Sequence, residues 1–502
     1  MYCPSLPKFP HRLHRLGVCL SLSLTIAGCA VGPDYLRPFA TLPEMFRSTP
    51  SETAAVPESE TIESAWWRRF GDPLLDELVS KARTQNFDLH AAIARVEEAE
   101  GLAAEAGATY FPQIDLKGSS TRSQVSTLNV MPLSSSVPRL QDSRKTGLAT
   151  SFELDLWGKL RRADESARAD LLASRYAQDA LALSITGSVV SSYLSLRATD
   201  ANLMLTQDTF DSRRKSLALV QARFEAGSSS PLEINQAEGS LAAAEAQLAD
   251  LRRQRALTES QLALLTGQPD LRIPSGRLAD LPLPPVPPAG LPSSLLEARP
   301  DVRQAEEALI SANARIGVAK AAYFPSLTLT GSYGGESAAL ADLFKSGARV
   351  WSLGLAATMP LFDAGRTSAR VDQATARQKQ ALASYQKTVH SAFKDVNDAL
   401  VGLREYAESD QAQEKRAEAA RKTLNLAQIR YEAGYIGFLD VLDAQRTAND
   451  AQLAAVTTRQ ARLSATVDLF KALGGGWNDE FAEASRRNTG VEKAPVVTLG
   501  KS

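Results

Sequence analysis

The sequence carries two copies of one structural plan, and this duplication restricts the possible folds more than any other feature. The segment TYFPQIDLKG at 109–118 returns as AYFPSLTLTG at 322–331. The segment RFEAG at 223–227 returns as RYEAG at 430–434, which is 207 positions later (430 − 223). Matched blocks that keep their order indicate a repeated unit, here predicted as helix, strands, long helix, turn and helix.

Each copy contains an unusually long stretch with no proline. One runs from 158 to about 225 and the other from 366 to 432. At a rise of 1.5 Å per residue, a helix of that length spans roughly 100 Å. The return path is predicted as helices at 232–266 and 300–323 for one half of the molecule, and at 439–473 and 74–110 for the other.

The second long helix shows the spacing of a coiled coil. Its apolar residues step by four and three: Tyr385, Val389, Ala392, Val396, Ala399, Leu403 and Tyr406. Leu382, Phe393 and Leu400 form a second stripe beside this seam. Two stripes indicate a helix with a neighbour on each side, as in a closed ring, whereas a two-stranded coiled coil predicts only one stripe.

Each copy also contains two candidate strands. Apolar and polar residues alternate over 148–156 and 351–359, and partner strands begin at 114 and 327. Segments of about ten residues with one polar face suit a membrane β-barrel, and the alternative is a half-buried strand in a soluble sandwich. The barrel is favoured because strands bracketed by very long helices leave no second sheet to pack on.

Four strands cannot close a barrel. The smallest membrane barrels use about eight strands, and open edges are not tolerated in lipid. Strands from several copies must therefore join, and three copies give twelve, a permitted even number. The polar stretches 121–145 and 334–349 are predicted as the outward loops of a trimeric, twelve-stranded barrel.

The N-terminus has the pattern of a secretory signal. Basic residues precede an apolar stretch from 16 to 26, and Ile26-Ala27-Gly28 comes directly before Cys29. A cysteine after small residues indicates a bacterial lipoprotein signal, so Cys29 is predicted to carry lipid; the alternative is an ordinary signal peptide with a chance cysteine. Ala30 is not the aspartate of inner-membrane retention, which favours the outer membrane.

These observations divide the chain into six predicted segments. A Pro-dense stretch, LPLPPVPPAGLP, separates the two copies and cannot form a regular helix. The segments are a signal peptide 1–28, a lipidated extended segment 29–64, a first repeat 65–267, a Pro-rich linker 268–298, a second repeat 299–476 and a disordered tail 477–502.

Composition argues against several classes of protein. Lys+Arg number 56 and Asp+Glu 57, and a net charge of −1 gives no long-range attraction for nucleic acid. No run of about 18 apolar residues follows residue 30, so a helical membrane span is not expected. His90 and His390 lie inside helical stretches, and no nucleotide, metal or catalytic motif appears. We therefore predict no enzyme activity, no metal and no cofactor.

Four longer motifs resemble a known family. They are CAVGPDYLRP at 29–38, WWRRFGDPLLDELV at 66–79, PAGLPSSLLEARPDVRQAE at 288–306 and MPLFDAGR at 359–366. They are similar to the outer-membrane efflux lipoproteins, the lipidated, NodT-like branch of the TolC-like outer membrane factors. The resemblance implies a homotrimer with a barrel on a periplasmic tunnel of twelve helices. It also implies docking to a periplasmic adaptor and an inner-membrane pump of the resistance-nodulation-division class.

The resemblance also locates a gate. In this family the helix tips, here at Gly227 and Gly434, form the closed periplasmic end and face the adaptor. Asp440 and Asp443 match the family's inward carboxylate rings, with Glu233 as the first-half counterpart of Asp440; the alternative is that they are solvated helix charges.

A tip-latching pair is implied as well. Tyr431 lies where the family keeps a latching aromatic, and a hydrogen bond from Tyr431 to Glu233 is expected. Ile436 occupies the position of a latching arginine in a relative, and Arg430 is a possible substitute.

The sequence thus predicts the outer-membrane channel of a tripartite efflux system in a Gram-negative bacterium, lipid-anchored, with its helical tunnel in the periplasm. The channel would be a passive exit duct for small molecules. Two alternatives stay open: an exit duct for type I protein secretion, and a lipid-tethered scaffold without a channel. The alternating strands disfavour the scaffold. The exported compound is not specified, because the pump selects it.

Overall fold

The computed structural model describes residues 30–39, 43, 46, 65–126, 138–286 and 298–477. The predicted signal peptide, Cys29 and all but the first residue of the predicted tail lie outside the described residues. The chain forms two compact units: the first comprises Met1–Pro38, Val96–Ala173 and Ala305–Tyr385, and the second Phe39–Arg95, Ser174–Gln304 and Gln386–Ser502. Both sequence repeats contribute to both units.

The helices and strands reproduce the repeat in their lengths. The first copy holds η1 (Trp66–Phe70), α2 (Pro73–Gln85), α3 (Phe87–Ala108), β1 (Gln113–Gln124), β2 (Leu140–Leu154), α4 (Lys159–Glu225) and α5 (Pro231–Leu265). The second holds α7 (Pro300–Ala321), β3 (Ser326–Ser337), β4 (Arg349–Thr358), α8 (Arg366–Glu432) and α9 (Phe438–Ala472). Because α4 and α8 have 67 residues each and α5 and α9 have 35 each, the predicted duplication is confirmed.

The helix predicted at 74–110 is wrong in one respect, because it is two helices. Asn86 interrupts it and begins α3: its side-chain oxygen accepts the backbone N–H groups of Asp88 at 2.9 Å and of Leu89 at 3.1 Å. Its side-chain amide donates to the carbonyl of Leu265 at 2.9 Å. Asparagine is a strong helix-starting residue, and here a tertiary contact fixes it in that role.

The strands also extend further than predicted. Residues 121–124 and 140–145, expected in an outward loop, belong to β1 and β2, and residues 334–337 belong to β3. The ladders continue because cross-strand polar pairs replace the apolar alternation, such as Lys145 with Glu336 at 2.9 Å. Between β3 and β4 the loop is short and contains two 3₁₀ turns, η4 (Leu340–Asp342) and η5 (Ser346–Ala348).

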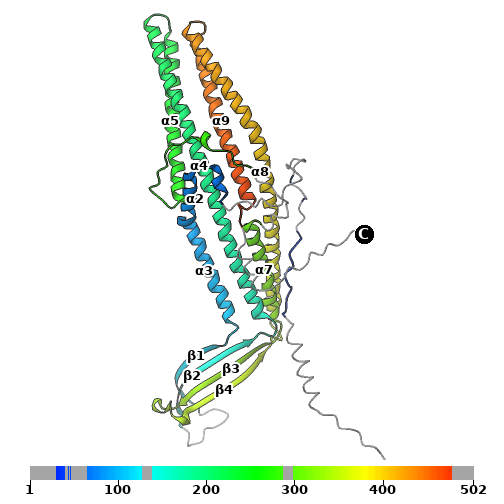
Figure 1. Cartoon of the computed structure of the whole chain (residues 1–502). Helices are drawn as coiled ribbons and strands as arrows, with labels where there is room; N and C mark the ends of the chain where they lie inside the picture. Colours follow the sequence, from blue (N-terminus) through cyan, green and yellow to red (C-terminus); the bar gives the residue numbers. More distant parts are fainter. Residues whose placement is uncertain are drawn as a thin grey trace, which may run out of the picture. The chain divides into compact units, whose positions relative to one another are not determined.

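The four strands form one antiparallel sheet in the order β1-β2-β3-β4 (Figure 1). Its register places apolar side chains on one face, where Leu116, Leu148, Tyr333 and Trp351 lie opposite one another across all four strands. All four side chains are more than half exposed. The other face carries polar or small residues, including Asp115, Ser332 and Ser352. A sheet with an exposed apolar face matches the predicted barrel wall.

The sheet is open within one chain. β1 and β4 each pair with one neighbour only, so one edge of each has no strand partner among the described residues. An unpaired backbone N–H or C=O group in hydrocarbon costs several kcal/mol. An apolar face and two free edges together require strands from further copies.

The main core of the second unit is built around the WWRRF motif. Trp66 is buried and stacks on Phe470 of α9, with ring centroids 5.1 Å apart. Asp72 begins α2 by accepting the N–H of Leu74 at 2.9 Å, and it also accepts the hydroxyl of the buried Tyr193. Part of the predicted Pro-rich linker belongs to the same core, because its residues Ile273, Leu278 and Leu281 are buried there; Leu278 lies in the 3₁₀ turn η2 (Leu278–Asp280).

The coiled-coil seam on α8 is largely confirmed. The first five seam residues, Tyr385, Val389, Ala392, Val396 and Ala399, are buried, whereas Tyr406 is 42% exposed. Phe393 and Leu400 of the second stripe pack with Val396, Leu469 and the ring of Phe46, which stacks on Phe393 at 5.2 Å. The seam residues Val396 and Ala399 belong to the same cluster, so within this chain the two stripes share packing partners. A separate neighbour for each stripe stays a prediction.

One described helix, α4, is apolar enough over part of its length to pass a hydropathy test for a membrane span. No such segment was expected from the sequence. Ile185, Val189 and Leu194 of α4 are buried in the main core. Packing inside the protein therefore accounts for their apolar character.

Candidate functional site

The tip between α4 and α5 is closed by main-chain hydrogen bonds. The N–H of Gly227 donates to the carbonyl of Phe224 at 2.9 Å, and the N–H of Ser228 donates to the carbonyl of Arg223 at 2.8 Å. This pair of bonds is the Schellman arrangement, which satisfies the last carbonyls of a helix. It needs a left-handed residue, and Gly227 has φ of +73°.

The tip between α8 and α9 is the same structure 207 positions later. The N–H of Gly434 donates to the carbonyl of Tyr431 at 3.0 Å, and that of Tyr435 to the carbonyl of Arg430 at 2.8 Å. Gly434 has φ of +82°. Open space surrounds the Cα atoms of both tip glycines, so backbone conformation alone selects glycine.

The helices that follow the tips begin with carboxylates at matching positions. The Glu233 carboxylate accepts the hydroxyl of Ser229, and the Glu233 N–H lies 3.4 Å from the Ser230 hydroxyl. The Asp440 carboxylate accepts the N–H of Gly437 at 3.2 Å. Each carboxylate therefore stabilises the first turn of its helix, a role that requires no gate.

Asp443 lies one turn further along α9 and pairs with Arg446 at 2.7 Å. Both side chains are more than 60% exposed. Such a surface pair contributes at most about 1 kcal/mol. Within one chain Asp443 is thus a solvated helix charge, which leaves it accessible for a role in an assembly.

Tyr431 is the buried anchor of the tips. Its side chain is 6% exposed and packs against Phe438, with ring centroids 5.5 Å apart, and against Val220 of α4. The predicted hydrogen bond from Tyr431 to Glu233 does not form within this chain. Its hydroxyl is buried without a hydrogen-bond partner among the described residues, and burial raises the pKa of Tyr431 against the opposing effect of Arg223.

Arg223, and not Glu233, contacts Tyr431 within the chain. Its guanidinium lies over the Tyr431 ring, 4.3 Å from the centroid. It also donates to the backbone carbonyls of Tyr431 at 3.1 Å and Glu432 at 3.0 Å. We call this contact the intrachain clamp, because it joins the end of α4 to the end of α8. The signal was present in the sequence, since arginine opens both RFEAG and RYEAG.

Aromatic and large apolar side chains surround the helix-proximal end of the sheet. Trp157 follows β2 and stacks on Phe324, which precedes β3, with ring centroids 4.8 Å apart. Phe111, before β1, is 74% exposed, and Phe362, after β4, is 90% exposed. Exposed aromatics at the ends of barrel strands are typical of the membrane interface.

The segment 30–38 docks at this same end of the first unit. The N–H of Val31 donates to the carbonyl of Trp157 at 2.9 Å, and the Asn313 side chain donates to the carbonyl of Pro33 at 2.9 Å. Arg37 pairs with Glu306 of α7 at 2.8 Å. The CAVGPDYLRP motif is therefore a tether that places the chain just after residue 29 beside the strand ends.

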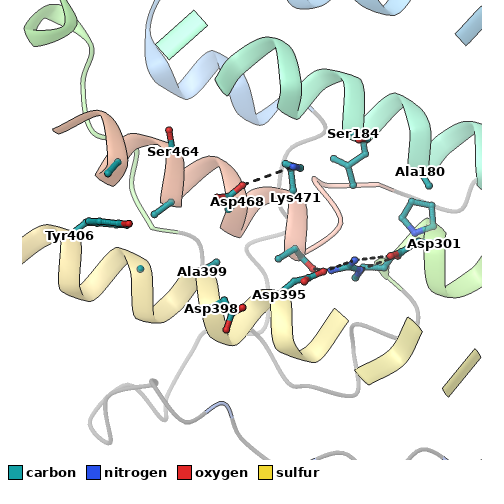
Figure 2. Close-up of a pocket in the computed structure, with 17 residues that line it drawn as sticks. Ala180, Ser184, Asp301, Asp395, Asp398, Ala399, Tyr406, Ser464, Asp468 and Lys471 are labelled. Carbon is teal, nitrogen blue, oxygen red and sulfur yellow. Dashed lines mark hydrogen bonds and ion pairs between the residues drawn. The ribbon is translucent and has the colours of Figure 1, made fainter. Parts of the chain in front are cut away.

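The second unit contains a cavity of about 770 Å³ between α4, α8, α9 and the start of α7 (Figure 2). Asp395, Asp398, Asp468 and Lys471 line it, and Asp468 lies 4.0 Å from Lys471. Partial desolvation raises the pKa of Asp468, and Asp395 adds repulsion. No group of three or more metal-binding side chains occurs in the part of the chain that the structure describes.

Arg299 is the first residue of the RPD sequence at 299–301, which lies at the edge of this cavity. It pairs with Asp301 at 2.7 Å and with Asp395 at 3.2 Å, and it donates to the carbonyl of Ala472 at 3.1 Å. Its side chain is only 11% exposed. These contacts join the start of α7 to α8 and to the end of α9, so we assign the cluster a structural role.

Comparisons with known proteins identify the family. The family model for outer membrane efflux proteins matches residues 78–268 and 291–475. The chain belongs to the outer membrane efflux protein family. It is 33% identical over 468 residues to the cation efflux system protein CusC of Escherichia coli O6:H1, covering 92% of this chain and 98% of that protein. It is 34% identical over 462 residues to the toluene efflux pump outer membrane protein TtgI of Pseudomonas putida, covering 91% and 97%.

Solved structures agree with this assignment. The open state of the Neisseria gonorrhoeae MtrE outer membrane channel superimposes with a TM-score of 0.79 at 32% identity, covering 89% of this chain and 98% of that chain. The predicted fold class is confirmed: two repeats supply long helices and one four-stranded antiparallel sheet, and the solved structures that the chain resembles are trimeric outer-membrane channels. The predicted channel function and outer-membrane location are confirmed as well, because this family provides the outer-membrane channels of tripartite efflux systems in Gram-negative bacteria. The lipid anchor stays a prediction.

We predict opposite effects from two Gly-to-Ala substitutions in this unit. Gly434→Ala should lower stability by about 1–2 kcal/mol, because a Cβ is strained in the left-handed region. Gly239→Ala, at an exposed site inside α5 with open space around it, should raise stability by roughly 0.5–1 kcal/mol. Thermal unfolding of the detergent-solubilised protein measures both, and an equal gain at the two sites would contradict the tip geometry.

Removing Arg299 should destabilise the second unit. We expect Arg299→Ala to cost about 1.5–3 kcal/mol, because it removes a buried guanidinium that hydrogen-bonds to two carboxylates and to the carbonyl of Ala472. The matched control is Arg277→Ala, since the Arg277–Asp280 pair is more than 60% exposed and 3.9 Å long. Thermal or urea unfolding compares the two variants, and similar losses from both would show that Arg299 is an ordinary surface arginine.

Proposed function

We propose that this chain is a lipid-anchored, homotrimeric exit duct whose periplasmic gate lies at the Gly227 and Gly434 tips and opens on docking of an adaptor protein. The observation that carries the proposal is the sheet, with one apolar face and two unpaired edges. Consecutive strands are antiparallel, so β1 and β4 run in opposite directions. The free edge of β1 in one protomer can therefore pair antiparallel with that of β4 in the next, which closes a ring of twelve strands.

The tether supports Cys29 as the lipidation site. Ala30 follows Cys29 directly and lies against Gly158, whose added Cβ would come within 2.9 Å of the Ala30 side chain. Gly158 follows Trp157 at the aromatic end of the sheet. The chain thus leaves the protein where the membrane interface is expected, which is where acyl chains on Cys29 can enter the outer membrane.

The charges at the tips support a gate. Asp440 and Asp443 are both exposed in one chain, and three copies bring six carboxylates to the tip end of the assembly. Like charges confined together repel one another, and cations relieve that repulsion. The proposed closed gate therefore favours cations. Adaptor docking opens it if the adaptor binds the open tips more tightly than the closed ones.

The exported compounds are small molecules delivered by the inner-membrane pump. The relatives named above are described as serving cation efflux and toluene efflux. Each of them is about one third identical to this chain over more than 90% of the length of this chain. One duct architecture thus accompanies different cargoes. We propose that substrate choice resides in the partner pump, and that this chain conducts passively.

Bilayer recording tests the duct and its gate together. The reconstituted protein should form ion-conducting channels that prefer cations. Asp440→Asn with Asp443→Asn should reduce the cation-to-anion permeability ratio roughly threefold or more, because each charge removed contributes on the order of 1 kcal/mol at close range in water. Asparagine keeps an oxygen that can accept the Gly437 N–H, so the start of α9 is preserved.

Two results would count against this proposal. The absence of any conductance would reject the duct itself. Unchanged selectivity in the double variant would show that these are solvated charges and that the gate lies elsewhere. Asp250→Asn, which removes an exposed charge from α5, is the control and should leave selectivity unaltered.

The lipid anchor has its own test. Cys29→Ser should abolish metabolic labelling with palmitate, because no other cysteine remains after the predicted signal is removed. The barrel is itself a membrane anchor, so part of the channel activity should survive. Labelling that persists in Cys29→Ser would reject this site, and Ser51→Ala serves as a neutral control in the same segment.

A further inference from the structure

The intrachain clamp uses three components. They are the guanidinium of Arg223, the ring of Tyr431, and the last carbonyls of α8, those of Tyr431 and Glu432. A cation at a helix C-terminus is favoured both by hydrogen bonding to the unsatisfied carbonyls and by the helix dipole. The clamp closes the contact between the first and second hairpins of one chain.

The repeat supplies a second complete set of the same components. Arg430 lies 207 positions after Arg223 and is its counterpart in the second repeat. In the first repeat, Phe224 and Glu225 are the counterparts of Tyr431 and Glu432. Arg430 therefore stands at the end of α8. An aromatic ring and two C-terminal carbonyls stand at the end of α4.

This second set is not assembled within one chain. Phe224 is 43% exposed, whereas its counterpart Tyr431 is 6% exposed. Arg430 is exposed, and its guanidinium makes no hydrogen bond or ion pair with the residues that the structure describes. The carbonyl of Phe224 accepts one hydrogen bond, from Gly227, and a carbonyl oxygen can accept two.

The helix face beside Arg430 is also uncovered. Leu426 is 60% exposed and Ile429 is 54% exposed. The counterpart of Leu426 on α4 is Leu219, which packs against the cluster of Val220, Tyr431 and Phe438. An apolar face that is covered in the first hairpin is thus open in the second.

We propose that Arg430 of each protomer clamps the tip of α4 in the neighbouring protomer, with its guanidinium over the ring of Phe224 and its N–H groups on the carbonyls of Phe224 and Glu225. This inference rests on the proposed trimer. Each hairpin then contacts the next one in the same way around the ring. Three contacts lie within protomers, made by Arg223, and three lie between protomers, made by Arg430.

Arg430 was expected as a substitute for the latching arginine that is absent at Ile436, and the proposed contact gives that role defined partners. An arginine over a ring and two carbonyls contributes through cation–π attraction and charged hydrogen bonds. The same contact repeated around a closed ring buries the apolar faces of Leu426 and Ile429 at each junction between protomers. Arg430 is accordingly a positioning residue for the closed tips.

Cysteine crosslinking in intact membranes distinguishes contacts between chains from contacts within a chain. Phe224→Cys with Arg430→Cys, treated with a short bismaleimide, should give covalent dimers and trimers on a denaturing gel. The matched pair, Arg223→Cys with Tyr431→Cys, should crosslink within one chain and stay at monomer mass. Each single-cysteine variant controls for reaction at Cys29 and should remain monomeric.

Native mass measurement of the same samples separates failure of the clamp from failure of the trimer. A trimer that yields no interchain product, or only an intrachain product, from the Phe224/Arg430 pair would overturn the proposed clamp. A protein that is not a trimer would overturn the proposed assembly as well. Interchain product from the Arg223/Tyr431 pair would also contradict the proposal, because it would assign the clamps the other way round.

A second measurement tests the contact without cysteines. Arg430→Ala and Phe224→Ala should each lower the temperature at which the detergent-solubilised trimer dissociates, and the double variant should lose no more than the larger single loss. Arg404→Ala, on the same helix and paired only with its exposed neighbour Glu405, should leave the temperature unchanged. Fully additive losses would show that Arg430 and Phe224 do not touch.

Discussion

The unpaired edges of the four-stranded sheet govern how this chain must assemble. β1 and β4 each present a row of backbone N–H and C=O groups with no strand partner among the described residues. Water satisfies such groups at the surface of a soluble protein, but lipid cannot, and each unsatisfied group then costs several kcal/mol. One face of the sheet is apolar and exposed, so it is suited to contact with lipid; its residues include Leu116, Leu148, Tyr333 and Trp351. The edges must therefore be joined by other copies of the chain.

The helix tips face the same physical problem in another form. The last carbonyls of a helix lack intrahelical partners, and the two tips satisfy some of them through the turns at Gly227 and Gly434. Arg223, which belongs to the hairpin of α4 and α5, donates hydrogen bonds to two further carbonyls at the end of α8. On our proposal, a neighbouring protomer completes the backbone groups left over at the sheet edges and at the end of α4, so the sheet and the tips favour the same oligomer.

Pattern-based prediction worked where a local rule is strong. The bounds of the long helices and the buried seam from Tyr385 to Ala399 follow from proline absence and periodicity, and the turns that contain Gly227 and Gly434 follow from the repeated sequence. It failed where a distant partner decides. The break at Asn86 depends on the carbonyl of Leu265, and the strands extend through polar residues because cross-strand pairs such as Lys145–Glu336 support them. The expected Tyr431–Glu233 bond does not form within the chain, where Arg223 of α4 lies over the Tyr431 ring and the Glu233 carboxylate accepts the hydroxyl of Ser229.

The sequence by itself determined the duplicated plan, the helix and strand types, the signal for lipidation and the need for more than one copy, because these depend on spacing along the chain. Only the tertiary structure decided which arginine contacts Tyr431, which half of each repeated pair is covered, and that RPD and WWRRF hold the second unit together. Arg223 and Arg430 occupy equivalent places in the two repeats. Within the chain, Arg223 contacts the Tyr431 ring, whereas Arg430 is exposed. Arg223 of the first repeat reaches the second repeat within the chain, whereas we propose that Arg430 of the second repeat reaches the neighbouring protomer.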